Sequence, residues 1–442
     1  MAAGSSRAVD THSGHVFKVA RKTEHSLELV TLFSMTSDQD VYIVESDPDE
    51  TVCMVDGCSG VTNYSEVIAK MGTLGGVVNF ISASSAASPE LQMAVQFRNF
   101  RKFKVDRYWA DPSGREVFQG SVMPLAVEEG VTTYPGHIFL MKRAIGENQE
   151  VVERLEMNPA HRIYVLDPAP DDEETFYSSK YQDHLVEMEF RAAYSTERGL
   201  PWLGCYPPKA PTLPMVPMPQ EGLGTVARRV HFREESRALD GPHYADLLAL
   251  SSGPPQGTQA FLIDDLLTPS ECEHIQELSL PHLRRAGVGS GPGRVAETRT
   301  SDTTFLNRNR SPTLDLVHRR MADVLGISDT DLSFVAEDLQ VVRYQEKQMY
   351  APHFDFSGGN GIDRLATLLV YLQTAEEGGG TSFPKAFPPH GLALYPKRGS
   401  AILFYSKLPD GNLDEMSAHS GMPVIKGTKM VCNLWVRSLL PR

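Results

Sequence analysis

The chain has few cysteines and no long apolar segment. Only five cysteines occur among its 442 residues, and no two of them have the C-x-x-C spacing of a zinc or redox site, so disulfides are not expected. The first ten residues lack the apolar core of a secretory signal, and no run approaches the roughly 20 residues that cross a membrane. These absences favour a cytoplasmic or nuclear protein.

The chain also lacks a positive charge balance. Its formal net charge is -14 at pH 7, which disfavours nucleic acid and anionic membranes as partners because both are polyanions. The apolar and charged fractions are those of an ordinary soluble protein. The length leaves room for roughly two or three domains.

The segment His353-Phe354-Asp355 is the clearest candidate for chemistry. Side chains two apart on a strand leave the same face, so His353 and Asp355 can converge on one point. No other histidine of the fourteen is followed two residues later by Asp or Glu. With His419 as a third donor, the set is the one expected for a non-heme Fe(II) oxygenase. The absence of a nearby thiolate argues against a closed zinc site.

A lysine follows in a segment with the pattern of a strand. Period-two alternation over residues 429–436 puts Lys429, Val431, Asn433 and Trp435 on one face. A lysine that faces inward needs an anionic partner, and a dicarboxylate cosubstrate supplies one. The alternative is a lysine at a strand end that points to solvent.

From about residue 259 to residue 442 the chain resembles the prolyl 4-hydroxylase family of 2-oxoglutarate-dependent dioxygenases. The matching segments surround the His-x-Asp motif and are residues 261–268 with Glu271-Cys272, Arg299-Thr300-Ser301, and residues 339–344, 364–372, 378–384 and 396–401. The resemblance implies a C-terminal double-stranded β-helix, or jelly roll, with flanking helices at 271–278 and 314–325. The chain as a whole is expected to be mostly β.

The resemblance also implies roles for individual residues. His353, Asp355 and His419 would bind Fe(II), and Lys429 would bind the distal carboxylate of 2-oxoglutarate. The other residues expected around the cosubstrate are Tyr344, Tyr371, Thr381 and Trp435, and those expected to contact substrate are Arg299 and Ser301. Tyr344 and Tyr371 could instead be half-buried sheet aromatics with satisfied hydroxyls.

The activity implied by the family is 4-hydroxylation of peptidyl proline. It would consume 2-oxoglutarate and O2, release succinate and CO2, and use ascorbate as a reductant. A glycine-rich segment at residues 287–293 is interpreted as a mobile lid, with an ordinary surface loop as the alternative. Two other functions remain open: oxygenation of another side chain or a free amino acid, and non-catalytic binding of prolyl or hydroxyprolyl peptides.

A second pattern lies in the N-terminal half. Short strands separated by Pro-Ser-Gly and Pro-Gly turns over residues 91–168 predict an antiparallel sandwich. This region resembles the β-domain of the von Hippel-Lindau tumour suppressor, which recognises hydroxyproline. Phe118 and Phe139 depart from the Tyr and Trp expected there. The resemblance implies a hydroxyproline pocket, although the same aromatics could form a core: Trp109, Thr133, Tyr134, His137 and Phe139.

These patterns divide the chain into four regions. Residues 1–87 form a tail and a β-rich region without an assigned role, 88–170 the β-domain, 171–257 a Pro-rich linker region, and 258–442 the catalytic domain. Within 206–219 a proline recurs at every third residue, which is typical of polyproline II: Pro208, Pro211, Pro214 and Pro217. The stretch is predicted to be a semi-rigid spacer, with a built-in substrate proline as the alternative.

Overall fold

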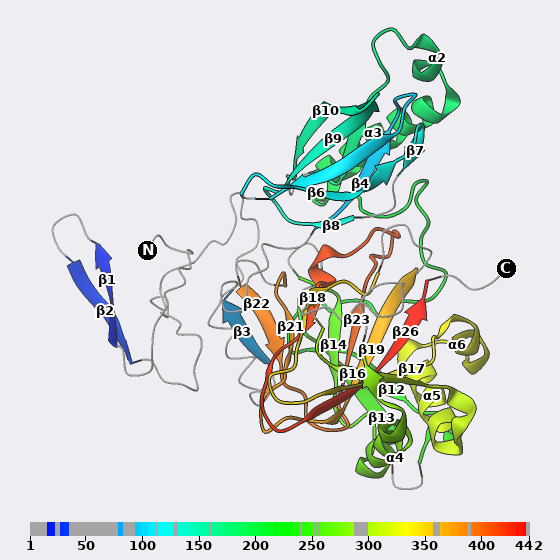
Figure 1. The fold of residues 1–442 in the computed structure, drawn as a ribbon. Coiled ribbons are helices and arrows are strands. Elements are labelled where there is room, and N and C mark those ends of the chain that lie inside the picture. The colour runs from blue at the N-terminus through cyan, green and yellow to red at the C-terminus, as the bar shows by residue number, and fades with distance from the viewer. Residues whose placement is uncertain are drawn as a thin grey trace.

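The structure is a computed structural model, and Figure 1 shows the course of the chain. It describes residues 16–22, 27–34, 78–82, 93–111, 113–127, 131–158, 161–220, 222–238, 241–251, 253, 257–286, 299–356, 363–386 and 390–438. The described part is mostly β and contains two regions in which strands are accompanied by helices. One is a β-domain that begins at Met93, and the other is the larger C-terminal region predicted to be catalytic, which we call the catalytic domain.

The catalytic domain is built on a nine-stranded sheet. Its strands pair in the order β12-β13-β14-β23-β19-β26-β17-β16-β15. Their bounds are β12 (Val226–His231), β13 (Tyr244–Ala249), β14 (Ala260–Ile263), β15 (Arg284–Arg285), β16 (Asp302–Leu306), β17 (Leu339–Tyr344), β19 (Arg364–Gln373), β23 (Ala401–Tyr405) and β26 (Lys429–Arg437). The inner strands β19 and β26 are almost wholly buried, because each has neighbours on both sides and both faces are covered.

A five-stranded sheet with the order β18-β24-β21-β22-β3 faces the large one. Its strands are β3 (Val78–Ser82), β18 (Tyr350–His353), β21 (Thr381–Phe383), β22 (His390–Leu394) and β24 (His419–Gly421), with the short pair β20 (Glu377–Gly378) and β25 (Val424–Lys426) at one end. Apolar residues from both sheets, such as Phe383 and Leu392 opposite Leu369 and Ile402, share one buried cluster. Two facing sheets around one core are the arrangement of a jelly roll.

Helices cover the outer face of the nine-stranded sheet. They are α4 (Pro269–Ser279), α5 (Pro312–Leu325) and α6 (Asp329–Val335), with 3-10 turns at η1 (Glu234–Ser236), η2 (Leu280–His282) and η3 (Arg308–Arg310). A further 3-10 turn, η4 (Glu415–Ser417), precedes β24 in the five-stranded sheet. A capping box begins α4, since Thr268 accepts from the backbone of Glu271 and Glu271 accepts from the backbone of Thr268. Gly326 ends α5 in the left-handed region, where glycine has no steric penalty. Both flanking helices predicted from the sequence are present.

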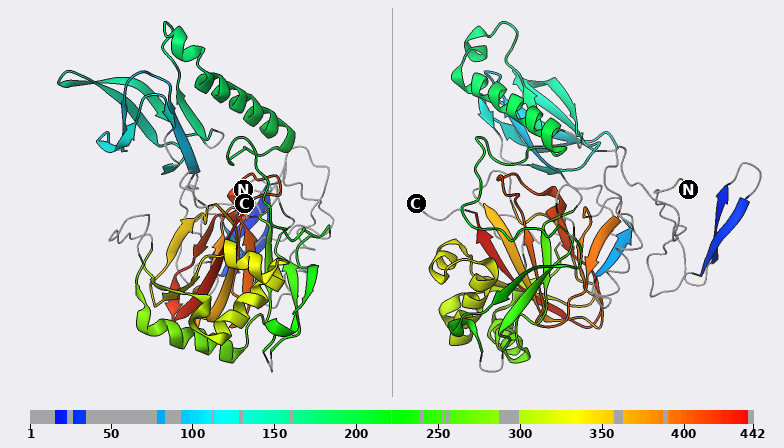
Figure 2. Two further views of the ribbon diagram at one scale, coloured as in Figure 1. Left: turned by 90° about the vertical axis from the view of Figure 1, so that its right-hand side faces the viewer. Right: turned by 180° about the vertical axis from the view of Figure 1, so that it is seen from behind.

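The β-domain contains two small sheets and a long helix. Its sheet orders are β10-β9-β5-β6 and β11-β4-β7, with β8 paired to β4. Figure 2 shows α3 running along one side of these sheets. The elements are β4 (Met93–Asn99), β5 (Val105–Ala110), β6 (Glu116–Val122), β7 (Ala126–Val127), β8 (Val131–Thr133), β9 (Ile138–Ile145), β10 (Asn148–Glu156), β11 (Ile163–Leu166), α2 (Glu173–Phe176) and α3 (Ser179–Arg198). The predicted short strands and turns are therefore present, but the expected purely antiparallel arrangement is wrong in one place, because β11 pairs with β4 in parallel.

Side chains of α3 dock it onto β4. The guanidinium of Arg98 donates to both carboxylate oxygens of Glu187, at 2.7 and 2.8 Å, and lies 2.8 Å from Nδ1 of His184. The rings of Phe100 and Tyr181 meet edge to face at 4.9 Å. The β-domain therefore extends beyond the predicted boundary at residue 170, because its sheet uses α3 as a cover.

The predicted linker at 171–257 differs from the structure in a second respect. Strands β12 and β13 lie within it, and β13 pairs with β14 at the edge of the nine-stranded sheet. The Pro-rich stretch forms no strand, as expected, but it is not a free spacer. Val216 is fully buried, and its backbone N–H donates to the Tyr405 hydroxyl at 3.0 Å. Sequence alone missed these contacts because the partners are distant in the chain.

The predicted N-terminal region, residues 1–87, is not a separate unit in the structure. Strand β3, assigned from the sequence to a separate region, pairs with β22 of the catalytic domain, with Val78 opposite Leu394. The hairpin of β1 (Val16–Lys22) and β2 (Leu27–Ser34) stands apart in Figure 1. The predicted run at residues 40–44 lies outside the described residues. An unpaired sheet edge accepts any strand of suitable geometry, so sequence order does not decide which one fills it.

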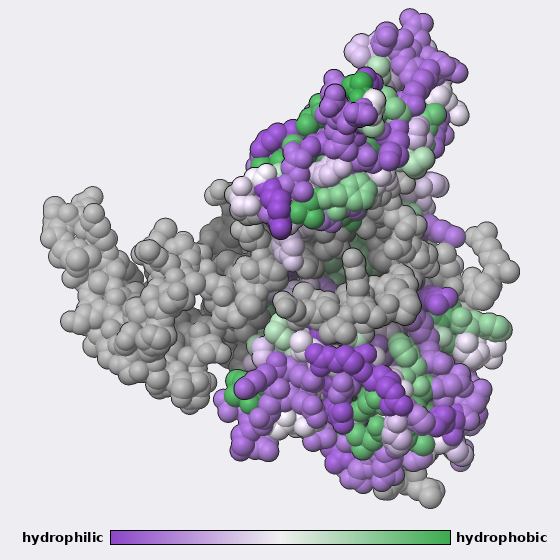
Figure 3. Space-filling model, viewed as in Figure 1, coloured by the Kyte–Doolittle hydropathy of each residue, from purple (hydrophilic) through white to green (hydrophobic). Residues whose placement is uncertain are grey.

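Hydrophilic residues dominate the described surface that Figure 3 shows, with small apolar patches between them. Among the residues that the structure describes, no helix has both the length and the apolar character needed to span a membrane.

A buried ion pair joins α4 to α5 and provides a test of the fold. Arg320 is 0% exposed and makes two hydrogen bonds to Glu271, at 2.7 and 2.8 Å. We expect Glu271→Gln to lower the free energy of unfolding by about 3 kcal/mol, because it leaves a buried guanidinium without its counterion. Urea denaturation followed by circular dichroism measures this change.

The matched control is Glu273→Gln on the same helix, whose exposed carboxylate pairs with Arg398. A surface pair of this kind contributes less than about 1 kcal/mol. Equal effects of the two substitutions would contradict a structural role for the buried pair.

Candidate metal centre and cosubstrate pocket

Three potential metal ligands meet between the two sheets of the catalytic domain. His353 ends β18, His419 begins β24, and the two are directly opposite each other in the antiparallel pairing. Asp355 follows two residues after His353. One ligand atom from each residue lies within 4.8 Å of the others, and Asp355 Oδ1 and Oδ2 are 3.8 and 3.6 Å from Nε2 of His353 and His419. Strand alternation and cross-strand pairing together create the cluster.

Neighbouring groups fix the orientation of each ligand. Nδ1 of His353 lies 2.9 Å from the Ala351 carbonyl, and Nδ1 of His419 lies 2.9 Å from the Ser417 carbonyl. When each Nδ1–H donates to its carbonyl, the Nε2 lone pair is left for a metal. Thr367 donates its hydroxyl to Asp355 Oδ2 at 2.6 Å. Thr367 therefore binds Oδ2 of Asp355 and leaves Oδ1 as the oxygen that can bind a metal.

The electrostatics of the cluster favour the protonation states that a cation needs. Burial, together with the charge of His419, lowers the pKa of His353 to about 3, so its imidazole is neutral. Burial alone would raise the pKa of Asp355, but the imidazoles of His419 and His353 and the Thr367 hydroxyl hold it below its usual value. Two imidazoles and a carboxylate are a donor set that fits Fe(II).

A buried lysine lies in the same barrel. Lys429 is 2% exposed, and its Nζ donates to the Gly380 carbonyl at 2.9 Å and lies 3.4 Å from the Thr381 hydroxyl. Among the residues that the structure describes, no carboxylate is within salt-bridge distance of it. Burial lowers the pKa of Lys429 to about 7. An anion that enters this pocket would supply the missing partner, so the pocket fits the distal carboxylate of 2-oxoglutarate.

Two tyrosines flank the lysine. Nζ of Lys429 lies 5.5 Å from the ring centre of Tyr344 and 5.0 Å from that of Tyr371. The Tyr371 hydroxyl is 2.6 Å from that of Thr381. Burial raises the pKa of Tyr344 to about 12, so both its hydroxyl and its ring remain uncharged near the lysine. The structure thus brings together Tyr344, Tyr371, Thr381 and Lys429, as the resemblance implies.

Trp435 lies at the other end of the same strand. It is opposite Thr367 in the sheet, and it is the sixth residue after Lys429, about 20 Å away along a strand. The guanidinium of Arg364 stacks on its ring at 3.6 Å and makes two hydrogen bonds of 2.8 Å to Glu337. Trp435 is therefore placed beside the metal cluster rather than beside Lys429.

The two residues expected to contact substrate have different surroundings. Arg299 lies with its guanidinium 4.6 Å from the ring centre of Tyr350, and that ring stacks on His353 at 3.6 Å. Ser301 is fully buried and its backbone accepts from Ala286. Direct contact with a peptide is thus open to Arg299 and not to Ser301 in this conformation. The predicted lid at 287–293 lies outside the described residues.

Sequence reasoning missed two of the surrounding groups. Tyr350 stacks on His353, and Arg364 donates to the backbone carbonyl of Asp355 at 3.3 Å. A signal existed for Thr367, which shares a strand face with Tyr371. No pattern within the sequence identifies Arg364 as a neighbour of Asp355, because the contact depends on how the chain returns after β18.

Most of the residues predicted for a hydroxyproline pocket also lie together. The rings of Trp109 and Tyr134 are 5.1 and 5.2 Å from that of His137, and the Thr133 hydroxyl is 3.1 Å from its Nδ1. Thr133, Tyr134 and His137 are at the end of β8 and in the turn before β9, and Trp109 reaches them from β5. Phe139 differs, since it is buried in the core of the β-domain against Phe97. Phe118 is exposed and packs on Tyr108, away from this group.

Comparisons with known proteins agree with this site. Residues 339–437 match the model of the 2OG-Fe(II) oxygenase superfamily. The chain is similar to Probable prolyl 4-hydroxylase 3 of Arabidopsis thaliana, with 35% identity over 201 residues that cover 40% of this chain and 69% of that protein. It is also similar to prolyl 4-hydroxylase subunit alpha-1 of Gallus gallus, with 34% identity over 184 residues that cover 39% and 34% of the two chains.

Among solved structures, the viral collagen prolyl hydroxylase of Paramecium Bursaria Chlorella virus-1 is 27% identical, with a TM-score of 0.34. The match covers 42% of this chain and 100% of the viral chain. The identity with the plant protein and its coverage, together with the metal cluster inside the matched region, establish that the chain belongs to the prolyl 4-hydroxylase family and is a 2-oxoglutarate-dependent dioxygenase of the 2OG-Fe(II) oxygenase superfamily.

Proposed function

We propose that the chain catalyses Fe(II)- and 2-oxoglutarate-dependent 4-hydroxylation of a peptidyl proline, with release of succinate and CO2. The observation that carries the proposal is the convergence of His353, Asp355 and His419 in one barrel with the buried Lys429. Relatives named prolyl 4-hydroxylases support proline as the target. Oxygenation of another side chain or a free amino acid is the alternative that the experiments below distinguish.

The residues of the chain have separate tasks in this reaction. Bound Fe(II), with 2-oxoglutarate and O2, supplies the oxidation that couples decarboxylation to hydroxylation. His353, Asp355 and His419 would hold the metal. Hydrogen bonds to the Ala351 and Ser417 carbonyls and from the Thr367 hydroxyl fix the orientation of these three side chains. These contacts set the ligand orientation before any cosubstrate binds.

Lys429 and its neighbours orient the cosubstrate. The ammonium pairs with the distal carboxylate of 2-oxoglutarate, and the Tyr344 and Tyr371 side chains enclose that carboxylate. Buried apolar residues of both sheets, including Phe383 and Phe404 beside His419, exclude water around the metal. Water exclusion strengthens the ion pair that holds the cosubstrate.

We also propose that the reaction takes place in the cytoplasm or nucleus and that ascorbate supports turnover. Three free cysteines in the described part of the chain are consistent with a reducing compartment. Imaging of the tagged protein tests the first proposal, and assays with and without ascorbate test the second.

The reaction itself can be followed with the intact chain. With Fe(II), 2-oxoglutarate and a set of proline-containing peptides, we expect succinate release and a mass gain of one oxygen atom on a proline of the peptide. We expect His353→Ala to abolish both, because it removes a metal ligand. Mass spectrometry of the peptide and of succinate measures the two products together.

The control for this experiment is His231→Ala, since His231 is an exposed histidine on β12 far along the chain from the metal ligands. Oxygen found on a residue other than proline would support the alternative target. Absence of succinate with every peptide, together with failure to bind Fe(II) under anaerobic conditions, would rule out the proposal.

Binding of 2-oxoglutarate tests the role of Lys429. We expect Lys429→Met to weaken 2-oxoglutarate binding about 100-fold, the size of effect expected when one member of a buried charge pair is removed. Lys426→Met is the control, because this exposed lysine on β25 pairs only with Glu376 in the described structure. Isothermal titration calorimetry under anaerobic conditions compares the variants.

The buried lysine also makes binding dependent on pH. Since burial lowers its pKa to about 7, Lys429 is mostly neutral above pH 7 in the free protein and must take up a proton to pair with a carboxylate. Affinity for 2-oxoglutarate should then fall by up to about tenfold for each pH unit above 7. Equal affinities at pH 6.5 and 8.5 would contradict this role for Lys429.

The β-domain supports a second proposal. We propose that the group formed by Trp109, Thr133, Tyr134 and His137 captures prolyl peptides, before or after hydroxylation, and so raises their concentration near the metal. Half-buried rings about 5 Å apart beside a polar histidine offer an apolar wall and a hydrogen-bonding group. The resemblance to a hydroxyproline-binding domain motivates the choice of ligand.

Paired proline and hydroxyproline peptides test this capture on the full chain carrying His353→Ala, which prevents turnover. We expect Trp109→Ala to weaken binding of at least one peptide about tenfold, since stacking on the indole ring is lost. Phe118→Ala, an exposed aromatic in the same domain, serves as the control. Unchanged binding in the Trp109 variant, measured by fluorescence anisotropy, would remove the proposal.

A further inference from the structure

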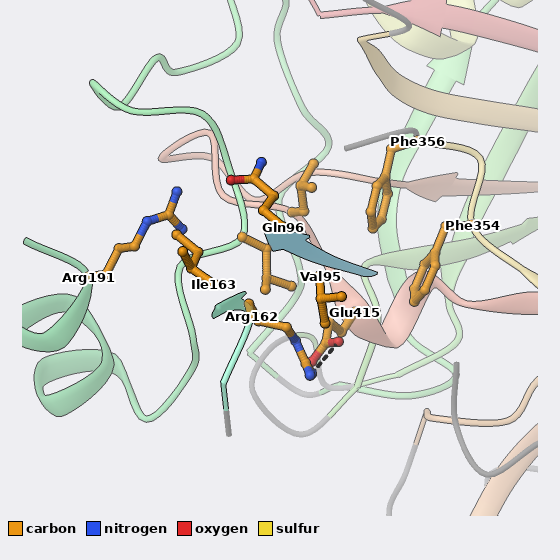
Figure 4. Close-up of a pocket in the computed structure, with 10 residues that line it drawn as sticks. Val95, Gln96, Arg162, Ile163, Arg191, Phe354, Phe356 and Glu415 are labelled. Atoms are coloured by element: carbon orange, nitrogen blue, oxygen red, sulfur yellow. Dashed lines mark hydrogen bonds and ion pairs between the residues drawn. The ribbon is translucent and has the colours of Figure 1, made fainter. Parts of the chain in front are cut away.

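A small hollow lies between the β-domain and the catalytic domain. Figure 4 shows Val95 and Gln96 on one side, with Phe354 and Phe356 on the other and the pair Arg162 and Glu415 between them. Six of the ten residues that line it are apolar, and the polar ones are Gln96, Arg162, Arg191 and Glu415. Neither the metal ligands nor Lys429 line this hollow, so it is distinct from the cosubstrate pocket.

Residues that line the hollow are close in the chain to metal ligands. Phe354 lies between His353 and Asp355 in the chain and Phe356 follows Asp355, so strand alternation turns these aromatics away from the ligand side. Glu415 lies four residues before His419. A polypeptide whose target residue is at the metal is therefore within a few residues of the hollow, because an extended chain spans about 3.4 Å per residue.

Two cationic side chains meet one carboxylate beside the hollow. Nη2 of Arg162 pairs with Glu415 at 2.6 Å, and Nζ of Lys385 lies 3.5 Å from the same carboxylate and 5.3 Å from the ring centre of Phe354. Two cations thus share one carboxylate. The buried carboxyl of Asp414 is also close enough to Lys385 to act on its charge, so Lys385 already has acidic neighbours and Arg162 is the group left to bind a further carboxylate.

Arg162 also has hydrogen-bonding capacity to spare. Its side chain is 10% exposed, yet its Nε and Nη1 have no partner among the described residues. The backbone of Arg162 is held in place, because its carbonyl accepts a hydrogen bond from the backbone N–H of Gln96 at 2.8 Å. Buried donors without acceptors are unfavourable, and a carboxylate is the acceptor that a guanidinium binds best.

The hollow is held in place by polar contacts between the domains. Tyr194 donates to Asp410 at 2.7 Å, and Asn412 accepts from the backbone N–H groups of Leu203 and Gly204 at 2.6 and 3.1 Å. With the pair of Arg162 and Glu415, these contacts tie the β-domain and α3 to the segment of the catalytic domain that leads to His419. The geometry of the hollow is therefore set before a ligand arrives.

We propose that this hollow is a substrate subsite that binds one acidic side chain of the polypeptide, a few residues from the target proline. The methylene groups of an Asp or Glu would contact Phe354 and Phe356 while the carboxylate binds Arg162. The inference rests on the proposed function and specifies its substrate class. Because the whole chain carries a net charge of -14, the preference arises from contact and not from long-range attraction, and it should persist at about 0.3 M salt.

The first arm of the test uses the unaltered full chain. A series of proline peptides places one Asp at each position from four residues before to four residues after the proline, and each has an Asn counterpart. We expect kcat/KM to favour Asp over Asn at least fivefold at one or two positions on one side of the proline. Equal values for Asp and Asn at every position would overturn the inference.

The second arm uses variants of the hollow. Arg162→Gln should remove the preference for Asp by raising KM, while the control Arg154→Gln, an exposed arginine on β10, should keep it. Glu415→Gln should strengthen the preference, because it releases Arg162 and Lys385 from their internal carboxylate. If Arg162 and Glu415 serve only to dock the domains, Glu415→Gln will instead act in the same direction as Arg162→Gln, and the inference fails.

A binding measurement separates this inference from the proposed function. Anisotropy of labelled Asp and Asn peptides with the full chain carrying His353→Ala reports the subsite without turnover. Hydroxylation of peptides with no preference for Asp refutes the subsite alone. Absence of any proline hydroxylation refutes the proposed function, and in that case equal binding of Asp and Asn peptides refutes the subsite as well.

Discussion

The burial of a lysine ammonium without a carboxylate partner is the interaction on which the site depends. A charge enclosed by β26, β21 and two tyrosines is unfavourable on its own, and the hydrogen bonds to Gly380 and Thr381 offset only part of that penalty. The described structure places no acidic side chain within salt-bridge distance of Lys429. The pocket is therefore complementary to an anion from outside, which is the property that a cosubstrate site requires.

The three candidate metal ligands come from only two short segments of the chain. His353 and Asp355 come from one short segment, and a single cross-strand pair brings His419 opposite to it. The carbonyls two residues before each histidine then fix the imidazoles. Most of the precision resides in the antiparallel pairing of β18 and β24, because a slip of one residue would turn the ligands to the other face.

The two domains are joined at the segment that precedes His419. Residues between Asp410 and Glu415 contact α3, the chain after it and Arg162 of the β-domain. The ligand-bearing segments therefore have the barrel on one side and the β-domain on the other. This position is the basis for the proposed capture of peptides by the β-domain.

The sequence by itself determined the parts that depend on local pattern. The alternation around His353 and Asp355 and the strand that carries Lys429 follow from side-chain period, which acts over a few residues. The helices near Glu271 and Leu314 were implied by the family resemblance of the surrounding segments. The structure has these elements where they were expected. The short strands and turns of the β-domain were predictable from local pattern as well.

Only the tertiary structure decided which distant segments meet. It joined β3 to β22, placed β12 and β13 in the large sheet, and buried Val216 in a stretch expected to be a spacer. It also placed Trp435 beside Arg364, put Ser301 in the interior and set Phe139 apart from the aromatic group near His137. Contacts between residues far apart in the chain depend on which sheet edges and apolar faces remain to be covered. That information belongs to the folded chain as a whole, and no local pattern carries it.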